Sequence, residues 1–382
     1  MGQFPHVRVS GSARERGRAY GEQARDRVRG SVETYRQVFA HYTGWDWPAV
    51  RAEAGRFEAP VAAFRPAYSD EIRGIAEGAG LDPLDVLAIN VRTEVMFAAR
   101  ARQAERSQRL PAECTAFAVV PPPGGTGPVL AGQNWDWVPA VAGNVIVLEA
   151  RQEGGPDYVT VVEAGLLAKT GMNSSGLGLV TNALVTSDDT GAPGVPYHVL
   201  LRAILDCENV SDALAVLQSH RRSSSANYLI AHRDGVAVDA EAAPGDYSAL
   251  FLLFPAGGVL LHSNHFLSPR FSGRDVSVWA MPDSPVRLAR AQAGVDALGR
   301  VPGLEDFRAL LSDHANFPSG VCCHPDPRLH PHDQGATLAS VLMDLSARQM
   351  WLADGSPCEA PYRRLDYAGF LAKPSPVAGV PV

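Results

Sequence analysis

The chain has 382 residues, of which 46% are apolar, and a formal net charge of −7. This length allows one large domain or two ordinary ones, each with a substantial core. The modest charge and the lack of clustered basic residues exclude the electrostatic pattern of a nucleic-acid-binding protein.

The N-terminal segment has no apolar stretch of the kind that a secretory signal needs. No apolar run approaches the roughly 18 residues of a membrane span. Five cysteines are an odd count and too few for a disulfide scaffold of this length. We therefore expect a soluble protein of the reducing cytoplasm, with no membrane partner.

The first third of the chain is predicted to be helical. Apolar residues recur at a spacing of three to four over 14–42, and a second helix, with capping residues near its start and glycines at its end, is predicted over 67–80. Asp82 followed by Pro83 is typical of the start of a further helix. The polar segment 102–113 then predicts an exposed loop.

Beyond this loop the pattern changes to short β-rich runs that are separated by glycine and proline. A helical pair is predicted over 196–207 and 210–220, with Ser211 as the N-cap of the second helix. More strands follow, then two helices near 284–298 and 303–313, and a closing hairpin over 335–354. This order predicts an α+β fold of two mainly antiparallel sheets with helices packed outside.

One cysteine stands where the polar loop meets the first strand, in "AECTAFAVV". Free cysteines usually act as small buried hydrophobes, as expected for Cys207 inside an apolar helix. Cys114 differs because exposed functional groups are common where a loop meets a strand. Asn134 and Asp136 end the next strand and point the same way, because strand side chains alternate. A hairpin of the two strands would bring them near Cys114.

Further candidates lie at another strand end, "LLHSNHF", which contains His262, Asn264 and His265. Either histidine would be a base for the thiol of Cys114 in a Cys–His arrangement. Lysine is rare in this chain, and Lys169 is the only internal candidate for amine chemistry.

Five blocks of sequence resemble, in order, the acyl-coenzyme A:6-aminopenicillanate acyltransferase-like family. This is the group of isopenicillin N acyltransferases and their bacterial relatives, within the N-terminal nucleophile hydrolases. The resemblance implies the αββα sandwich of those enzymes and runs from about residue 10 to about 355. Its blocks are "CTAFAVVPPPGGTGPVLAGQNWDW", "EAGLLAKTGMNSSGLGLVTNAL", "GVPYHVLLRAIL", "HSNHF" and "GATLASVLMDL".

The resemblance implies that the chain cuts itself before Cys114. Residues 1–113 would then be a helical small chain and 114–382 the catalytic chain, together one αββα domain. The thiol attacks the preceding carbonyl, and water hydrolyses the resulting thioester. The α-amine that is released has an ordinary pKa of roughly 8 and serves as the base.

Site roles follow from the same resemblance. Cys114 is the nucleophile, Asp136 orients the cysteine or its new amine, and Asn264 donates to the oxyanion, a role worth about 2.7–4 kcal/mol. Asn134 and His265 are expected to support the site or the substrate. The expected partner is a small amide or N-acyl compound, with an acyl thioester as an alternative donor; water as acceptor gives hydrolysis and an amine gives acyl transfer.

Two positions depart from the family pattern. Glu113 stands where glycine commonly precedes the nucleophile, and it would either alter the strained geometry that assists cleavage or act as a local base. Asp333 and Gln334 precede "GATL" where fungal members have Ser-Arg. The missing arginine removes a charge beside Asp136 and weakens the expectation of a penicillin-type substrate.

The segment "CCHPDPRLHPH" over 322–332 raises the question of a metal. Adjacent Cys322 and Cys323 do not easily ligate one tetrahedral zinc ion, and no second paired cluster exists in the sequence. We interpret the segment, with His324, His330 and His332, as a loop beside the substrate pocket. No metal and no cofactor are expected.

Two alternatives stay open. The first is a thiol hydrolase that is not cleaved and pairs Cys114 with His265 or His262. The second is a non-catalytic relative that keeps the fold as a binding protein, because fold alone does not imply function.

Overall fold

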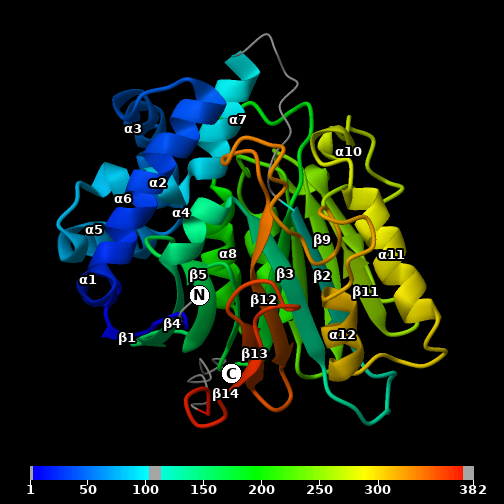
Figure 1. The fold of residues 1–382 in the computed structure, drawn as a ribbon. Helices are drawn as coiled ribbons and strands as arrows, with labels where there is room; N and C mark the ends of the chain where they lie inside the picture. Colours follow the sequence, from blue (N-terminus) through cyan, green and yellow to red (C-terminus); the bar gives the residue numbers. More distant parts are fainter. Residues whose placement is uncertain (1–2, 103–112, 373–382) are drawn as a thin grey trace.

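The computed structural model describes residues 3–102 and 113–372, so the predicted loop over 102–113 lies almost wholly outside the described residues. The prediction of a helical first third is confirmed for the described part (Figure 1). Asp82 caps its helix as predicted, since its side chain accepts a hydrogen bond from the Leu84 amide at 2.9 Å. The helices are α1 (Ala13–Gln23), α2 (Arg25–Thr43), α3 (Trp47–Gly55), α4 (Glu58–Phe64), α5 (Pro66–Ala79), α6 (Pro83–Asn90) and α7 (Arg92–Arg102).

One sheet has eight strands in the order β1-β4-β5-β6-β7-β8-β9-β10. Its edge strand β1 pairs in parallel with β4, and the other neighbours are antiparallel. The sequence interpretation missed β1, which precedes the helices. The strands are β1 (His6–Gly11), β4 (Val145–Gln152), β5 (Tyr158–Glu163), β6 (Thr170–Asn173), β7 (Leu177–Ala183), β8 (Ala226–His232), β9 (Val236–Ala242) and β10 (Leu250–Leu253).

The second sheet has six strands in the order β11-β2-β3-β12-β13-β14, and all its pairs are antiparallel. The predicted closing hairpin is confirmed as β12 and β13. The strands are β2 (Glu113–Val119), β3 (Leu130–Trp137), β11 (Val259–His262), β12 (Ala336–Asp344), β13 (Gln349–Ala353) and β14 (Arg363–Asp366).

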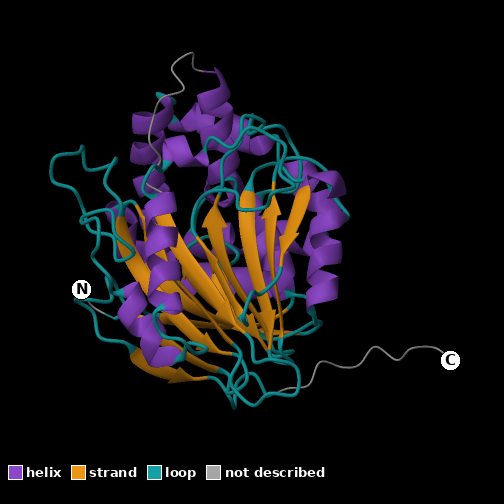
Figure 2. Ribbon diagram, turned by 90° about the vertical axis from the view of Figure 1, so that its right-hand side faces the viewer, coloured by secondary structure: helices purple, strands orange, loops and turns teal. Residues whose placement is uncertain are grey.

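The two sheets pack face to face between helical layers, which confirms the predicted sandwich (Figure 2). Helices α8 (Tyr197–Leu205) and α9 (Val210–Gln218) lie against the eight-stranded sheet. Helices α11 (Ser284–Asp296) and α12 (Leu304–Leu311) cover the six-stranded sheet, at the right of Figure 1. The short elements are α10 (Ser277–Ala280), η1 (Pro139–Asn144) and η2 (Tyr247–Ala249).

Two details complete the fold. The predicted N-cap of α9 was wrong, because the cap is Asn209, whose side chain accepts from the Asp212 amide at 2.9 Å. Among the described residues, no helix combines the length and the apolar character that crossing a membrane requires.

Candidate active site

Cys114 is the second residue of β2, and it pairs directly with Trp135 of β3. The predicted hairpin is therefore confirmed, and it places Cys114 beside the end of β3. Cys114 is buried in the apolar core that contains Trp135 and Ala116. Its side chain therefore faces the interior between the two sheets rather than the solvent.

Side chains from distant parts of the chain hold the backbone of Cys114. Its amide donates a hydrogen bond to Asn264 Oδ1 at 2.7 Å. Strand register explains this contact, because His262 pairs with Ala116 and the chain then continues alongside Cys114 to Asn264. The Cys114 carbonyl accepts from Asn182 Nδ2 at 3.0 Å, across the sandwich from β7. Both polar groups of the Cys114 backbone are thus bound by side chains.

Arg287 of α11 contacts both the Cys114 carbonyl and the Asn264 side chain from the other side of β2. Its Nη1 donates to the Cys114 carbonyl at 2.8 Å and its Nη2 to Asn264 Oδ1 at 3.0 Å. Asp283, one turn earlier, accepts from Arg287 Nε at 2.7 Å and fixes the guanidinium. Sequence reasoning missed Arg287, because α11 contains two arginines and burial, which the sequence does not show, distinguishes this one from Arg290.

Asn264 presents its oxygen to Cys114 in this structure. Two donors, the Cys114 amide and Arg287, meet Oδ1, while Nδ2 donates to the Ala183 carbonyl at 3.0 Å. The side chain therefore binds the nitrogen atom of Cys114 here, and its role as an oxyanion donor stays a prediction.

The side chain of Asp136 projects from the face of the sheet opposite the Cys114 thiol, because Trp135 is the strand partner of Cys114, whereas the Asp136 backbone amide hydrogen-bonds to the thiol. Its Oδ1 accepts from Thr337 Oγ1 at 2.5 Å, and Thr337 Oγ1 accepts in turn from the Cys323 amide at 3.0 Å. Burial raises the pKa of Asp136 to about 7, although the positive charge of Arg287 opposes this. Asp136 therefore changes its charge in the neutral range.

Asn134 faces the same side as Asp136, as the strand alternation predicts. Its Nδ2 donates to the carbonyls of Leu311 and Val321, each at 2.8 Å. Asn134 thus joins β3 to the end of α12 and to the segment after it, whereas Asp136 reaches that segment only through Thr337 of β12. Within the described residues, Asn134 forms no hydrogen bond with Cys114.

Lys169 supplies positive charge on the thiol side. Its ammonium lies 4.7 Å from the centre of the Trp135 ring, and Trp135 pairs with Cys114. Burial raises the pKa of the Cys114 thiol to about 11, and Lys169 opposes this rise. Burial also lowers the pKa of Lys169 to about 8. The lysine singled out in the sequence therefore influences the thiol electrostatically.

The two histidines have partners other than Cys114. His262 meets the Ser263 carbonyl through Nδ1 at 2.7 Å and Glu241 through Nε2 at 2.9 Å. His265 Nδ1 lies 2.8 Å from Ser284 Oγ. Within the described part of the chain, neither ring forms a hydrogen bond with Cys114, and this geometry offers a Cys–His pair no support.

The remaining candidates lie outside this cluster. Asp333 binds His41 Nε2 of α2 at 2.8 Å, and Gln334 donates to the Leu329 carbonyl at 3.1 Å in its own loop. The backbone of Glu113 pairs with Asp136 at the start of β2, while the Glu113 side chain lies outside the described structure.

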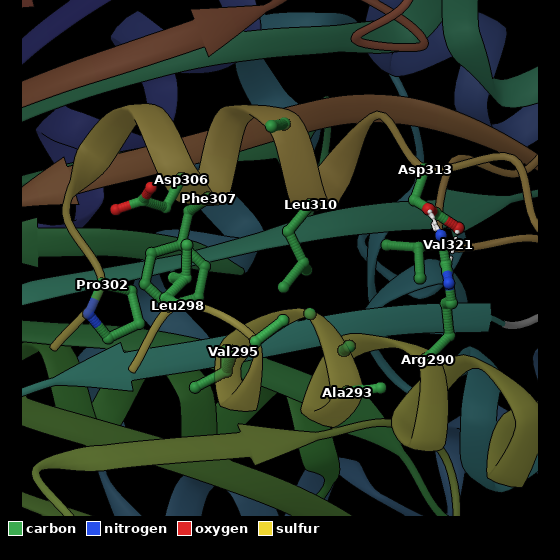
Figure 3. Close-up of a pocket in the computed structure, with 14 residues that line it drawn as sticks. Arg290, Ala293, Val295, Leu298, Pro302, Asp306, Phe307, Leu310, Asp313 and Val321 are labelled. Atoms are coloured by element: carbon green, nitrogen blue, oxygen red, sulfur yellow. Dashed lines mark hydrogen bonds and ion pairs between the residues drawn. The ribbon is translucent and has the colours of Figure 1, made fainter. Parts of the chain in front are cut away.

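A separate cavity of about 390 Å³ lies between α11 and α12 (Figure 3). Phe307 lines it and stacks on Phe117 of β2 at 3.5 Å between ring centres. The ion pair of Arg290 and Asp313, at 2.8 Å, borders one end. Cys114 is not among the lining residues, so this cavity belongs to the helical layer and not to the candidate site.

A family model and a curated relative both match this chain and point to the same family. The model of the family described as acyl-coenzyme A:6-aminopenicillanic acid acyl-transferase matches residues 123–359. The 40 kDa form of acyl-coenzyme A:6-aminopenicillanic-acid-acyltransferase from Emericella nidulans is 26% identical over 358 residues, which cover 92% of this chain and 93% of the relative.

Solved structures with a similar arrangement are more distant. An N-acylethanolamine-hydrolyzing acid amidase orthologue from Caenorhabditis elegans has a TM-score of 0.43 at 14% identity, covering 61% of this chain and 93% of that one. A mutant conjugated bile acid hydrolase from Clostridium perfringens has a TM-score of 0.44 at 13% identity, covering 68% and 94%. At these scores the likenesses add nothing to the family match.

Proposed function

Because the chain belongs to the acyl-coenzyme A:6-aminopenicillanic acid acyl-transferase family, we propose that it is a self-processing cysteine enzyme that transfers or hydrolyses acyl groups at small amides. Cys114 is the nucleophile. The observation that carries this proposal is the 2.7 Å hydrogen bond from the Cys114 amide to Asn264 Oδ1. After cleavage before Cys114, that same nitrogen atom becomes the α-amine that the chemistry requires.

Self-cleavage breaks the peptide bond between Glu113 and Cys114. The thiol adds to the Glu113 carbonyl, the bond to the Cys114 nitrogen breaks, and a thioester forms. Water then hydrolyses the thioester and leaves a carboxylate on Glu113 and a free amine on Cys114. Asn264 holds the departing nitrogen, while Asn182 and Arg287 hold the next carbonyl in place.

Turnover uses the new amine as the base. In the uncut chain, burial holds the pKa of the thiol near 11, so thiolate is scarce at neutral pH. An α-amine with an ordinary pKa of roughly 8 accepts the thiol proton as Cys114 attacks the substrate carbonyl. The leaving amine takes that proton, and a thioester acyl-enzyme remains. Water or a second amine then removes the acyl group.

The substrate is a small molecule that carries its acyl group either as an amide or as a thioester. The name of the Emericella nidulans relative specifies an acyl-coenzyme A donor and 6-aminopenicillanic acid as acceptor. We extend only the chemistry of the donor to this chain: an acyl thioester or an amide acylates Cys114. Asp136 and Asn264 keep the roles assigned above, which are to orient the new amine and to bind the developing oxyanion.

Acyl-enzyme trapping tests the proposal. Wild type, Cys114→Ala and Cys207→Ala are incubated with N-acyl p-nitroanilides of increasing chain length and with matching acyl-coenzyme A thioesters. Released nitroaniline and the mass of acylated peptides are measured. We expect an acyl adduct on the Cys114 peptide of wild type and of Cys207→Ala. The Cys207 thiol lies between α8 and α9, just beyond the helix in which the sequence analysis expected it, and donates to the Ala203 carbonyl. Full activity in Cys114→Ala would disprove the proposal.

A further inference from the structure

Four side chains with sulfur or imidazole ligand atoms converge beside the active-site sheet. His314, Cys322 and His324 come from the segment after α12, and Cys358 comes from the segment between β13 and β14. One ligand atom of each residue lies within 4.8 Å of those of the other three. The cluster is separate from Cys114 and from the proposed acyl-transfer chemistry.

Four of the six separations between these ligand atoms lie close to the edges of a zinc-centred tetrahedron, and the two from His314 to the sulfur atoms are within 4.8 Å. His324 Nε2 lies 3.1 Å from His314 Nε2, 3.5 Å from Cys322 Sγ and 3.3 Å from Cys358 Sγ. The two sulfur atoms are 3.6 Å apart. A tetrahedral zinc ion with bonds of about 2.3 Å to sulfur and about 2.0–2.1 Å to nitrogen separates its ligand atoms by about 3.3–3.8 Å. We propose that these four residues bind one zinc ion.

The ligand set favours zinc in a structural role. Two thiolates and two imidazoles in tetrahedral geometry suit zinc, and four protein ligands leave no open position for substrate. Glu359 lies on the other side of the His324 ring, with Oε1 3.8 Å from Nδ1. A carboxylate near the second ring nitrogen is typical of zinc-bound histidines.

A disulfide is the main competing explanation for the two cysteines. Cys322 and Cys358 have sulfur atoms 3.6 Å apart, whereas a disulfide bond is about 2.05 Å long. A disulfide would also leave the convergence of His314 and His324 on both sulfur atoms without a function. Zinc binding accounts for all four side chains together.

The proposed ion would fix the segment that braces the candidate active site. Within this segment, the Val321 carbonyl accepts from Asn134 at 2.8 Å. The Cys323 amide donates to Thr337, which donates to Asp136. Zinc would thus tie the surroundings of Asp136 to the segment between β13 and β14.

The expectation of no metal considered only the segment 322–332. Two of the ligands, His314 and Cys358, lie outside that segment and join it only in the folded chain. Of the adjacent cysteines, Cys322 alone joins the cluster. His330 also lies elsewhere, stacked on His41 with ring centres 4.3 Å apart.

Metal analysis of the full chain tests the proposal. The protein is purified under reducing conditions and without a polyhistidine tag. Its zinc content is measured by inductively coupled plasma mass spectrometry. Wild type is expected to contain about one zinc ion per chain. The zinc content of Cys358→Ser and of His314→Asn is expected to be lower by about tenfold or more. His220→Asn is the control, because His220 is an exposed histidine outside both clusters of possible metal ligands, and this variant should keep its zinc.

Cobalt provides a readout that does not depend on the variants folding. Wild type that has been stripped of zinc should take up Co²⁺ with the intense visible absorption of a tetrahedral thiolate complex. Wild type that binds neither zinc nor Co²⁺ would overturn the proposal, as would unchanged zinc in both ligand variants. An intact mass lower by two hydrogens, mapped to Cys322 and Cys358, would show a disulfide and would equally overturn it.

Discussion

At the scale of single residues, Lys169 is the charged side chain with the largest effect on the pKa of the Cys114 thiol. Its ammonium favours the thiolate and therefore opposes the rise in thiol pKa that burial causes. Because burial lowers the pKa of Lys169 to about 8, this help is present near neutral pH and fades as the pH rises above 8. The reactivity of the thiol therefore depends on the charge of Lys169.

Replacement of Lys169 by Met should raise the pKa of Cys114 and slow its alkylation. We expect a decrease of about tenfold near pH 7, which corresponds to one pKa unit or about 1.4 kcal/mol. The rate of iodoacetamide labelling at Cys114, followed by peptide mass spectrometry from pH 6 to 10, measures the effect. Lys169→Arg keeps the charge and should stay close to wild type; equal rates in Lys169→Met would contradict the electrostatic coupling.

The raised pKa of Asp136 predicts that the stability of the fold depends on pH. Burial raises its pKa in the folded state to about 7, above the unfolded value of roughly 3.9. A raised pKa means that the stabilising contribution is complete below about pH 4 and is lost as the pH rises through 7. Asp136→Asn removes this titration and keeps an oxygen for Thr337.

Urea unfolding at pH 5 and pH 8 measures this contribution in a Cys114→Ala background, which keeps one chain. Between pH 5 and pH 8, the free energy of unfolding of the protein with Asp136 should fall by on the order of a few kcal/mol more than that of the Asp136→Asn variant. The same loss in both proteins would show that Asp136 is already ionised at pH 5.

At the scale of elements, α1 and α5 pack so closely that glycine is required on both. A Cβ atom on Gly21 would lie 2.2 Å from the Ile75 carbonyl, and one on Gly78 would lie 2.1 Å from the Arg18 carbonyl. Both neighbours are backbone atoms and cannot rotate away. The glycines, spaced by four residues from Gly17 and Gly74, therefore set the distance between the two helices.

Gly21→Ala should separate the helices and destabilise the protein by about 1–3 kcal/mol, as overpacking typically does. Gly294→Ala in α11 is the matched control, because its nearest neighbour, Leu310 Cδ1, would lie at an ordinary 3.5 Å. That change should be neutral or stabilising by about 0.5–1 kcal/mol, since alanine favours helix. Free energies of unfolding in urea distinguish the two, and equal values would refute the close-packing account.

Local patterns predicted elements well and long-range pairing poorly. The periodicity of α2, the Asp82 cap and the hairpin of β12 and β13 depend on neighbours in the chain, and all are confirmed. Strand β1 was missed because its partner is β4, far along the sequence. The contacts of Arg287 with Cys114 arise in the same way, since nothing in the local pattern of α11 indicates them.

At the scale of the whole molecule, the two segments on either side of the proposed cleavage point form one body. Residues before Cys114 supply β1 to the eight-stranded sheet. Arg92 forms a buried ion pair with Glu163, and Trp137 Nε1 donates to the Tyr35 hydroxyl at 2.9 Å. These buried contacts should hold both chains together after cleavage.

Intact mass spectrometry of wild type and Cys114→Ala, under native and denaturing conditions, tests self-processing most directly. Wild type should separate on denaturation into chains 1–113 and 114–382, the second beginning with the sequence CTAFAV, and should remain one complex under native conditions. Cys114→Ala should remain a single chain without activity. An active wild type that persists as one uncut chain of 382 residues, together with full activity in Cys114→Ala, would contradict the account.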